Sequence, residues 1–226
     1  MGLRRIFRYD LRGPLVQALV VPNSCEEINP AMKSESAPDF DADVHRDDRL
    51  FAVCLGGRAP GCRVELHDVA FAVGTNLQSI HHSLLDQWFG TPDGLHVDAW
   101  AVLDRVPGFR VELSTEPSEN SLNLYFVNIG GYRPGEFGER HAWAFYAGHG
   151  PAEVKARARR ELLPGTESVH RDDLHAIDDL VGLESVAGRH IHLVPDINAG
   201  SPVVTNGYFP LPRATVTAWK RSRAKA

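Results

Sequence analysis

Cysteine and long apolar runs are scarce in this chain, and each scarcity excludes a class of protein. Three cysteines among 226 residues are an odd and low number, which is typical of a reduced cytoplasmic protein rather than of a disulfide framework. No apolar run approaches the length of a membrane-spanning helix. The early arginines imitate a signal peptide, but Asp10 and Arg12 interrupt the apolar stretch and no small-residue cleavage site follows. We therefore expect a cytoplasmic protein that does not span a membrane.

Positive charge is also in short supply. The chain has 24 Lys and Arg against 29 Asp and Glu, a formal net charge of −5. This balance makes non-specific binding to nucleic acid or to an acidic membrane surface an unlikely role. Hydrophobic residues make up 43% of the chain, which is enough to bury a sizeable core. The partner that these observations leave is an unknown small ligand or protein.

The first part of the chain differs from the rest. Residues 1–48 are acidic and polar after the Leu15–Val21 stretch, and they lack periodicity. Such a composition predicts a disordered lead-in. Translation from Met32 would make the upstream segment an artefact of gene assignment, and a real N-terminal arm is the alternative.

From Leu50 the chain reads as two copies of one unit. The stretch that starts LFAVCLGG at Leu50 recurs without a gap 74 residues later as LYFVNIGG at Leu124. Repeated segments of this kind predict a duplicated architecture. We expect unit 1 over 49–118, unit 2 over 119–196, and a C-terminal strand with a basic tail over 197–226. The identical pairs of the first segment are Gly56/Gly130, Gly57/Gly131, Pro60/Pro134, Gly61/Gly135, Glu65/Glu139, His67/His141, Ala70/Ala144, Phe71/Phe145 and Gly74/Gly148.

Each unit is predicted to contain two strands, a helix and two more strands. Apolar runs before the glycines and alternating patterns after them indicate a strand hairpin, with Pro-Gly turns between. Leu77, Ile80, Leu84 and Trp88 recur at helical spacing, and Pro151 suits a first helical position. LHVDAW is compatible with a strand or a short helix. The predicted fold is α+β: two ββαββ units about a pseudo-twofold axis, with sheets covered by helices on one face.

The glycine pairs do not predict a phosphate-binding loop. Neither Gly56-Gly57 nor Gly130-Gly131 belongs to a G-x-x-x-x-G-K-[ST] or G-x-G-x-x-G motif. The element predicted after each loop is a strand, whereas these motifs open a helix. The loops are therefore interpreted as tight connections between strands.

The polar residues that recur are E-x-H and H-x-D pairs. In unit 1 they are Glu65, His67, His96 and Asp98, and in unit 2 they are Glu139, His141, His170 and Asp172, with Asp104/Asp178 and Gly108/Gly182 continuing the same register. Residues two apart on a strand share a face. Two histidines with carboxylates form a ligand pattern for a divalent transition metal. The alternative is structural: His67 would donate to a backbone carbonyl, Glu65 would bind turn amides, and Asp98 would cap a short helix.

GGRAPGCRVELHDVAFAVG, Trp88-Phe89-Gly90 and LHVDAW resemble the bacterial family called domain of unknown function 1543. The resemblance covers roughly residues 50–195 and implies one or two copies of a domain per chain, without an activity. Unit 2 departs from it at Leu162-Leu163-Pro164 and at Leu174. A non-catalytic binding or structural module is the first functional hypothesis, and a metal-dependent enzyme using the paired sets is the second.

The composition break before Leu50 generates a first prediction. A chain shortened to begin at Met32 should unfold with the same free energy as the full chain, because the removed residues should contribute nothing to the core. Urea denaturation measures this. A loss of more than about 1 kcal/mol would show that Leu15–Val21 packs on the folded part.

Overall fold

The computed structural model describes residues 47–132, 134–162 and 179–225. The predictions for Leu15–Val21 and Met32, and those for His170, Asp172 and Asp178, lie outside these residues. The first half of the described chain contains β1 (Arg49–Gly57), β2 (Leu66–Gly74), the 3₁₀ helix η1 (Gln78–Ile80), α1 (His81–Gln87), β3 (His96–Val102), β4 (Arg105–Val106) and β5 (Phe109–Ser114).

The second half repeats this order of elements. It contains β6 (Asn123–Gly131), β7 (Arg140–Gly148), α2 (Pro151–Glu161), β8 (Asp179–Leu183), β9 (Ser185–Val186) and β10 (Arg189–Pro195), followed by β11 (Val204–Pro210) and α3 (Arg213–Arg223). The protein is therefore a mixed helix and strand fold of antiparallel sheets with few helices. None of the helices in the described part is long and apolar enough to cross a membrane.

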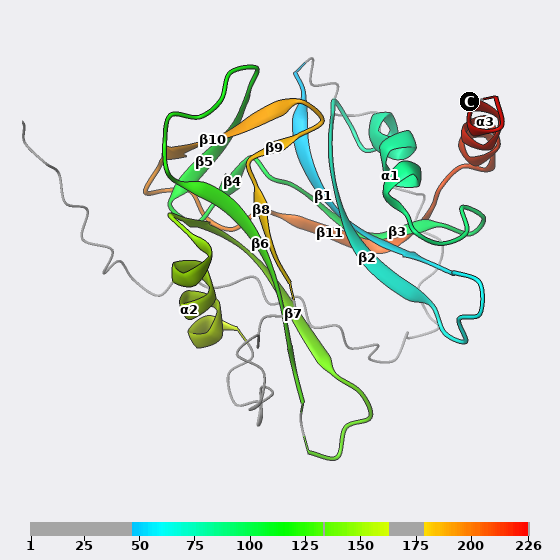
Figure 1. The fold of residues 1–226 in the computed structure, drawn as a ribbon, viewed down its shortest axis with the longest axis horizontal. Coiled ribbons are helices and arrows are strands. Elements are labelled where there is room, and N and C mark those ends of the chain that lie inside the picture. The colour runs from blue at the N-terminus through cyan, green and yellow to red at the C-terminus, as the bar shows by residue number, and fades with distance from the viewer. Residues whose placement is uncertain (1–46, 133, 163–178, 226) are drawn as a thin grey trace, which may run out of the picture.

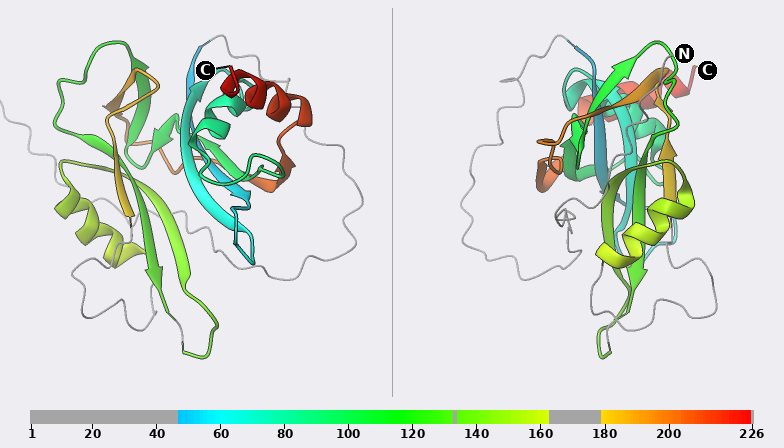
Figure 2. Two further views of the ribbon diagram at one scale, coloured as in Figure 1. Left: turned by 45° about the vertical axis from the view of Figure 1, so that its right-hand side comes forward. Right: turned by 90° about the vertical axis from the view of Figure 1, so that its left-hand side faces the viewer.

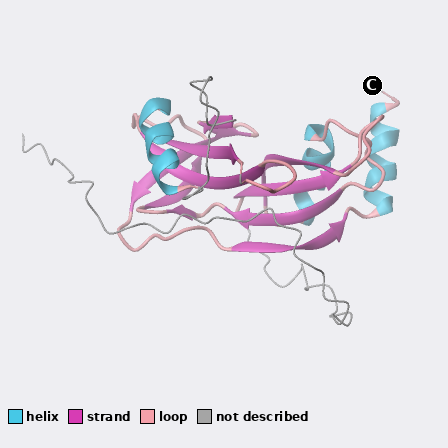
Figure 3. Ribbon diagram, turned by 90° about the horizontal axis from the view of Figure 1, so that it is seen from below, coloured by secondary structure: helices cyan, strands magenta, loops and turns pink. Residues whose placement is uncertain are grey.

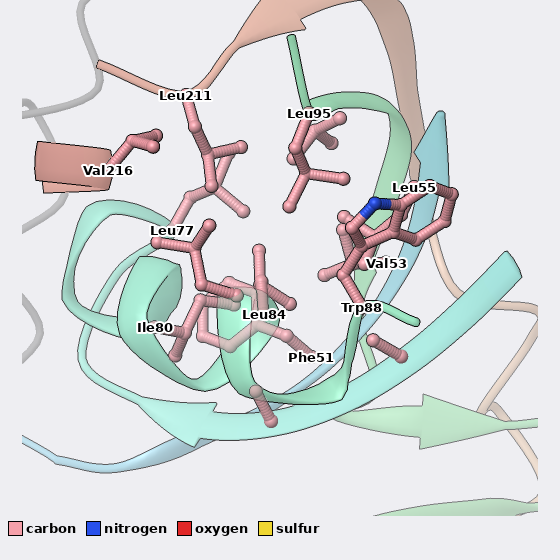
Figure 4. Close-up of a cluster of buried hydrophobic side chains, with 14 residues drawn as sticks. Phe51, Val53, Leu55, Leu77, Ile80, Leu84, Trp88, Leu95, Leu211 and Val216 are labelled. Carbon is pink, nitrogen blue, oxygen red and sulfur yellow. The ribbon is translucent and has the colours of Figure 1, made fainter. Parts of the chain in front are cut away.

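The first sheet has the strand order β11-β3-β1-β2, with α1 and α3 near one of its faces (Figure 1). Alternate residues of β1, namely Phe51, Val53 and Leu55, point toward the helices. There they pack with Ile80, Leu84 and their neighbours in one buried cluster (Figure 4). Fully burying one such side chain stabilises the fold by about 1.5–3 kcal/mol. The helix spacing predicted from Leu77 to Trp88 is confirmed, since all four of those side chains are buried.

The second sheet has the order β7-β6-β8, and α2 covers one face. Pro151 occupies the first turn of α2, as predicted. Val154, Ala158 and Leu162 pack on Val127 and Ile129 of β6. Helices consequently lie toward opposite ends of the molecule, with strands between them (Figure 3).

A third sheet joins the two halves. Its order is β4-β5-β10-β9, and the central pair joins β5 of the first half to β10 of the second, with Leu113 opposite Ile191 and Val111 opposite Leu193. Above it lies a shared core in which the other faces of β1 and β6 meet (Figure 2). Phe71 and Phe145 both pack there, with ring centroids 6.4 Å apart. Each is half-buried rather than fully buried as predicted.

The equivalence of the two halves holds in the strand hairpins but shifts afterwards. Gly56 pairs with His67, and Gly130 pairs with His141, at the predicted offset of 74 residues. In the next strand, Val102 pairs with Phe51 and Gly182 pairs with Tyr125, so the offset between Val102 and Gly182 is 80 residues. The prediction that Gly182 matches Gly108 is therefore wrong. Gly182 lies inside β8, whereas Gly188 occupies the turn that corresponds to Gly108, and both turn glycines have positive φ.

Three other elements clarify the sequence analysis. LHVDAW forms a strand, β3, rather than a helix. The C-terminal stretch VVTNGYFP forms the predicted edge strand, β11, beside β3. The basic residues after Trp219 are exposed as expected, but those up to Arg223 complete helix α3, which the sequence analysis did not anticipate. Trp219 Nε1 donates to Asp86 and Lys220 pairs with Asp93, which fixes α3 beside α1.

The pairing of β5 with β10 predicts that neither half folds alone. Residues 50–118 without the rest of the chain should be poorly folded, because β3 loses β11, β5 loses β10 and the faces of Leu50 and Ala52 lose their cover. Far-UV circular dichroism and urea titration, compared with the full chain, measure this. A monomeric fragment with a cooperative transition would contradict it.

Candidate metal centre

The site begins with a row of residues across three strands. Gly56 of β1 pairs with His67 of β2 on one side and with His96 of β3 on the other. Directly opposed residues on neighbouring strands lie within side-chain reach of each other. The two histidines therefore flank one glycine and lie on the same face of the sheet, although 29 residues separate them in the chain.

A β-bulge adds the first carboxylate to this row. On β1 the consecutive residues Cys54 and Leu55 pair with Ala99 and Val97, so Asp98 is the extra residue of β3. Bulges re-aim side chains and are frequent beside functional sites. Here the bulge places Asp98 Oδ1 3.3 Å from His96 Nε2 and Asp98 Oδ2 3.2 Å from His67 Nε2.

The second carboxylate comes from the residue just before β2. Glu65 Oε1 lies 3.2 Å from His96 Nε2 and 3.5 Å from His67 Nε2. Ligand atoms of Glu65, His67 and Asp98 all lie within 4.8 Å of one another. We refer to Glu65, His67, His96 and Asp98 as the four-residue cluster. All four unit 1 residues selected from the sequence meet at one place, on two strands and the end of one loop.

Gly56 provides the floor of the cluster. A Cβ at this position would collide with His96 Nε2 and would lie 2.5 Å from Asp98 Oδ2. Real Cβ atoms do not approach so closely, so only glycine leaves the space in which the side chains converge. The sequence analysis selected Gly56 as a turn residue and missed this role, because cross-strand contacts do not show in a linear pattern.

The Trp88-Phe89-Gly90 motif supports the loop that carries Glu65. The Trp88 ring packs where a side chain on Gly57 would otherwise lie, and Gly90 approaches the backbone carbonyl of Arg58. Thr91 N–H donates to that same carbonyl at 2.7 Å. These contacts tie the start of the β1–β2 loop to the end of α1. The motif therefore holds the hairpin from behind without contacting the cluster itself.

The protons of His96 give the cluster its electrostatic character. His96 Nδ1 donates to the carbonyl of Gly94 at 2.9 Å, since a carbonyl can only accept. In a neutral imidazole, Nε2 then carries a lone pair, and it faces carboxylate oxygens of both Glu65 and Asp98. Three electron-rich atoms at about hydrogen-bond distance repel one another unless a proton or a metal ion lies between them.

Burial sharpens this requirement at Asp98. Loss of water raises the pKa of the Asp98 carboxyl above its usual value, and the neighbouring His96 and His67 only partly offset the effect. Asp98 Oδ2 is buried and accepts no well-aligned hydrogen bond among the described residues. Desolvation and the charge of Asp98 likewise raise the pKa of the Cys54 thiol to about 12, so Cys54 stays protonated. Asp98 therefore needs a cation more than a water-exposed carboxylate does.

Exposure differs across the cluster. The His96 side chain is 2% exposed, and the ring of Tyr208 covers it at a centroid distance of 4.5 Å. His67 and Glu65 are 39% and 44% exposed. The cluster is thus closed on the His96 side and open to solvent on the other. The predicted helix-capping role of Asp98 is wrong, because Asp98 lies within β3.

The second half brings together only part of its predicted set. His141 Nε2 lies 3.7 Å from Glu139 Oε2, and His141 Nδ1 lies 3.1 Å from Asn128 Oδ1. Asn128 occupies the place that Cys54 has in the first half, and sequence analysis did not select it. His170 and Asp172 lie outside the described residues. By the offset of β8, the positions that correspond to His96 and Asp98 are Ala176 and Asp178 rather than His170 and Asp172.

Comparison with known proteins places this geometry in a family. The model of the family described as Domain of Unknown Function (DUF1543) matches residues 62–113. The crystal structure of protein Il1583 from Idiomarina loihiensis is 31% identical, covers 74% of this chain and 99% of its own, and superposes with a TM-score of 0.58. The chain belongs to the DUF1543 family. No curated protein matches it.

The DUF1543 match contains the whole four-residue cluster. Residues 62–113 include Glu65 and His67 at the start of β2, and His96 and Asp98 in β3. They also include the Trp88-Phe89-Gly90 support and the bulge. The hairpin of the second half lies outside the matched residues.

The space above Gly56 generates a prediction about stability. Gly56→Ala should lower the free energy of unfolding by about 1–3 kcal/mol, because the added methyl group forces His96 and Asp98 apart. Gly200→Ala is the matched control, since a Cβ there meets nothing within 4 Å, and it should change stability by less than about 0.5 kcal/mol. Urea denaturation compares the two. Equal stabilities would mean that the cluster does not fill the space over Gly56.

Proposed function

We propose that this DUF1543 protein binds one divalent transition-metal ion at Glu65, His67, His96 and Asp98. The observation that carries the proposal is the position of His96 Nε2. Its lone pair faces two carboxylates, while the Nδ1 proton is committed to Gly94. A metal ion between these atoms replaces three repulsions by three attractive contacts.

The chemistry of the donors selects the kind of ion. Two imidazoles and two carboxylates are typical ligands of zinc, iron and manganese, whereas calcium and magnesium prefer oxygen alone. A histidine that binds such an ion usually donates its other N–H to a carbonyl, as His96 does to Gly94. Two carboxylates also balance the charge of a divalent cation. Asp98, with its buried and unpaired Oδ2, gains most from the ion.

The open side of the cluster leaves room for a further ligand on the ion. Glu65 and His67 are each more than a third exposed, whereas His96 is closed off. Catalytic metal sites keep such an open position for water or substrate, and structural sites close it. Metal binding is the property shared by a binding module and a metal-dependent enzyme, and the open position is compatible with both.

We further infer that the chain arose by tandem duplication and that the ion belongs to the first half. Support comes from the repeated order of elements and from the equivalent pairs Gly56–His67 and Gly130–His141. In the second half Asn128 takes a contact with His141. An amide can donate or accept a hydrogen bond, so it satisfies an imidazole without a cation. One ion per chain is the expected content.

Metal analysis of protein purified without a metal-affinity tag tests the proposal. The native chain should contain about one equivalent of a transition metal, in keeping with one site of the kind described above. His67→Ala and Asp98→Asn should each remove it, because each deletes one donor of the set. His141→Ala is the matched control, since it removes the equivalent histidine of the second half, and its metal content should equal that of the native chain.

The opposite result has a defined meaning. If the native chain takes up no ion from zinc, iron or manganese solutions, a proton on His96 holds the cluster together and its role is structural. His67→Ala should then cost about 1–3 kcal/mol of stability by leaving a carboxylate unpaired. Loss of metal in His141→Ala as well as in His67→Ala would instead overturn the assignment of the ion to the first half.

A further inference from the structure

Strand β11 is irregular at the point where it passes the cluster. Asn206 pairs with Ala99 and Phe209 pairs with Val97, so Gly207 and Tyr208 together lie opposite the single residue Asp98. Gly207 has φ +155°, and a Cβ there would lie 2.7 Å from the Phe209 ring. Phe209 packs against the core beneath the first sheet. The irregularity therefore anchors Phe209 in the core and directs Tyr208 to the other side.

Tyr208 combines a fixed contact with a free surface. Its ring lies 4.5 Å from the His96 ring, centroid to centroid, at an interplanar angle of 48°. Nevertheless, Tyr208 is 67% exposed. Solvent-exposed aromatic rings are costly in water and are enriched where proteins bind ligands. Since His96 needs only one face covered, most of the Tyr208 ring remains available to another molecule.

A second exposed apolar residue precedes the cluster. Val64 directly precedes Glu65 and is 71% exposed. The polar donors Glu65 and His67 are thus accompanied by an apolar side chain at the loop, and His96 by an aromatic one on β11. A polar centre with apolar neighbours is the usual composition of a site for a small organic molecule.

Resting on the proposed metal site, we propose that the ion binds a small oxygen-donor ligand that carries a flat apolar group, and that Tyr208 recognises that group. The ligand oxygen occupies the open position of the ion on the side of Glu65 and His67. Its flat group lies against the free surface of the Tyr208 ring, which continues the stack that begins on His96. Tyr208 is therefore a specificity-determining residue and not a metal ligand.

Cobalt-loaded full-length protein tests this with two matched probes. Acetohydroxamate and benzohydroxamate offer the same oxygen donors to the ion and differ only in a methyl or a phenyl group. The visible absorption of bound Co²⁺ reports binding of either probe. The quantity compared among variants is the ratio of the two dissociation constants, which cancels the intrinsic difference between the probes.

Tyr208→Ala should reduce the preference for benzohydroxamate by roughly 3- to 10-fold, the worth of one aromatic pair. Acetohydroxamate affinity and cobalt content should stay unchanged. Tyr208→Phe should keep the native ratio and Tyr208→Leu should lose it, so the assignment remains testable if the alanine variant does not fold. Phe137→Ala removes an exposed aromatic ring from the distant β6–β7 loop and is the control.

Each outcome separates the two proposals. A native ratio in Tyr208→Ala or in Tyr208→Leu overturns the role of Tyr208 and leaves the metal site standing. Binding of cobalt without binding of either probe overturns the open coordination position and the ligand class. A native chain that takes up no cobalt overturns the metal site, and the ligand proposal with it.

Discussion

The pairing of β1 with two strands at once is the constraint on which the rest of the structure depends. Its alternate residues bury Phe51, Val53 and Leu55 under the helices and Leu50 and Ala52 in the shared core. A strand covered on both faces leaves no position for a charged side chain until it ends. At that end the side chains stop at Gly56 and Gly57, and the polar residues of β2 and β3 close over the space. The cluster exists because the core beneath it fixes three strands in one register.

Local patterns predicted much of this and long-range pairing predicted little. The strand hairpins, the buried helix residues from Leu77 to Trp88 and the edge strand β11 all follow from periodicity, since each depends on neighbours in the chain. The joining of β5 to β10 was not predicted, because strand partners far apart leave no sign in a single sequence. Helix α3 was missed because its basic residues suggested a solvated tail, while Leu211 and Val216 anchor it.

The site was predicted in composition but not in geometry. Recurrence of Glu65, His67, His96 and Asp98 in the aligned units selected all four members that the strands bring together. The gap-free alignment extended too far, however, and assigned His170 and Asp172 to places where the β8 register has Ala176 and Asp178. Gly56 as the floor, the bulge at Asp98 and the cover by Tyr208 were missed. All three are cross-strand relations, and a period-two pattern describes only one strand.

The energetics of the cluster argue against a purely structural role. Two carboxylates and two imidazoles at the end of a core cost more in lost hydration than an apolar set of similar volume, so stability alone does not favour them. His96 adds to this cost, because its Nδ1–H is bound to Gly94 and its Nε2 faces the carboxylates. The second half shows what relief without an ion looks like, since Asn128 contacts His141 there. The first half has the thiol of Cys54 at that position, which stays protonated and brings no charge. A cation is the one partner that satisfies all four side chains of the first half together, and the protein holds them where such a cation would also meet solvent.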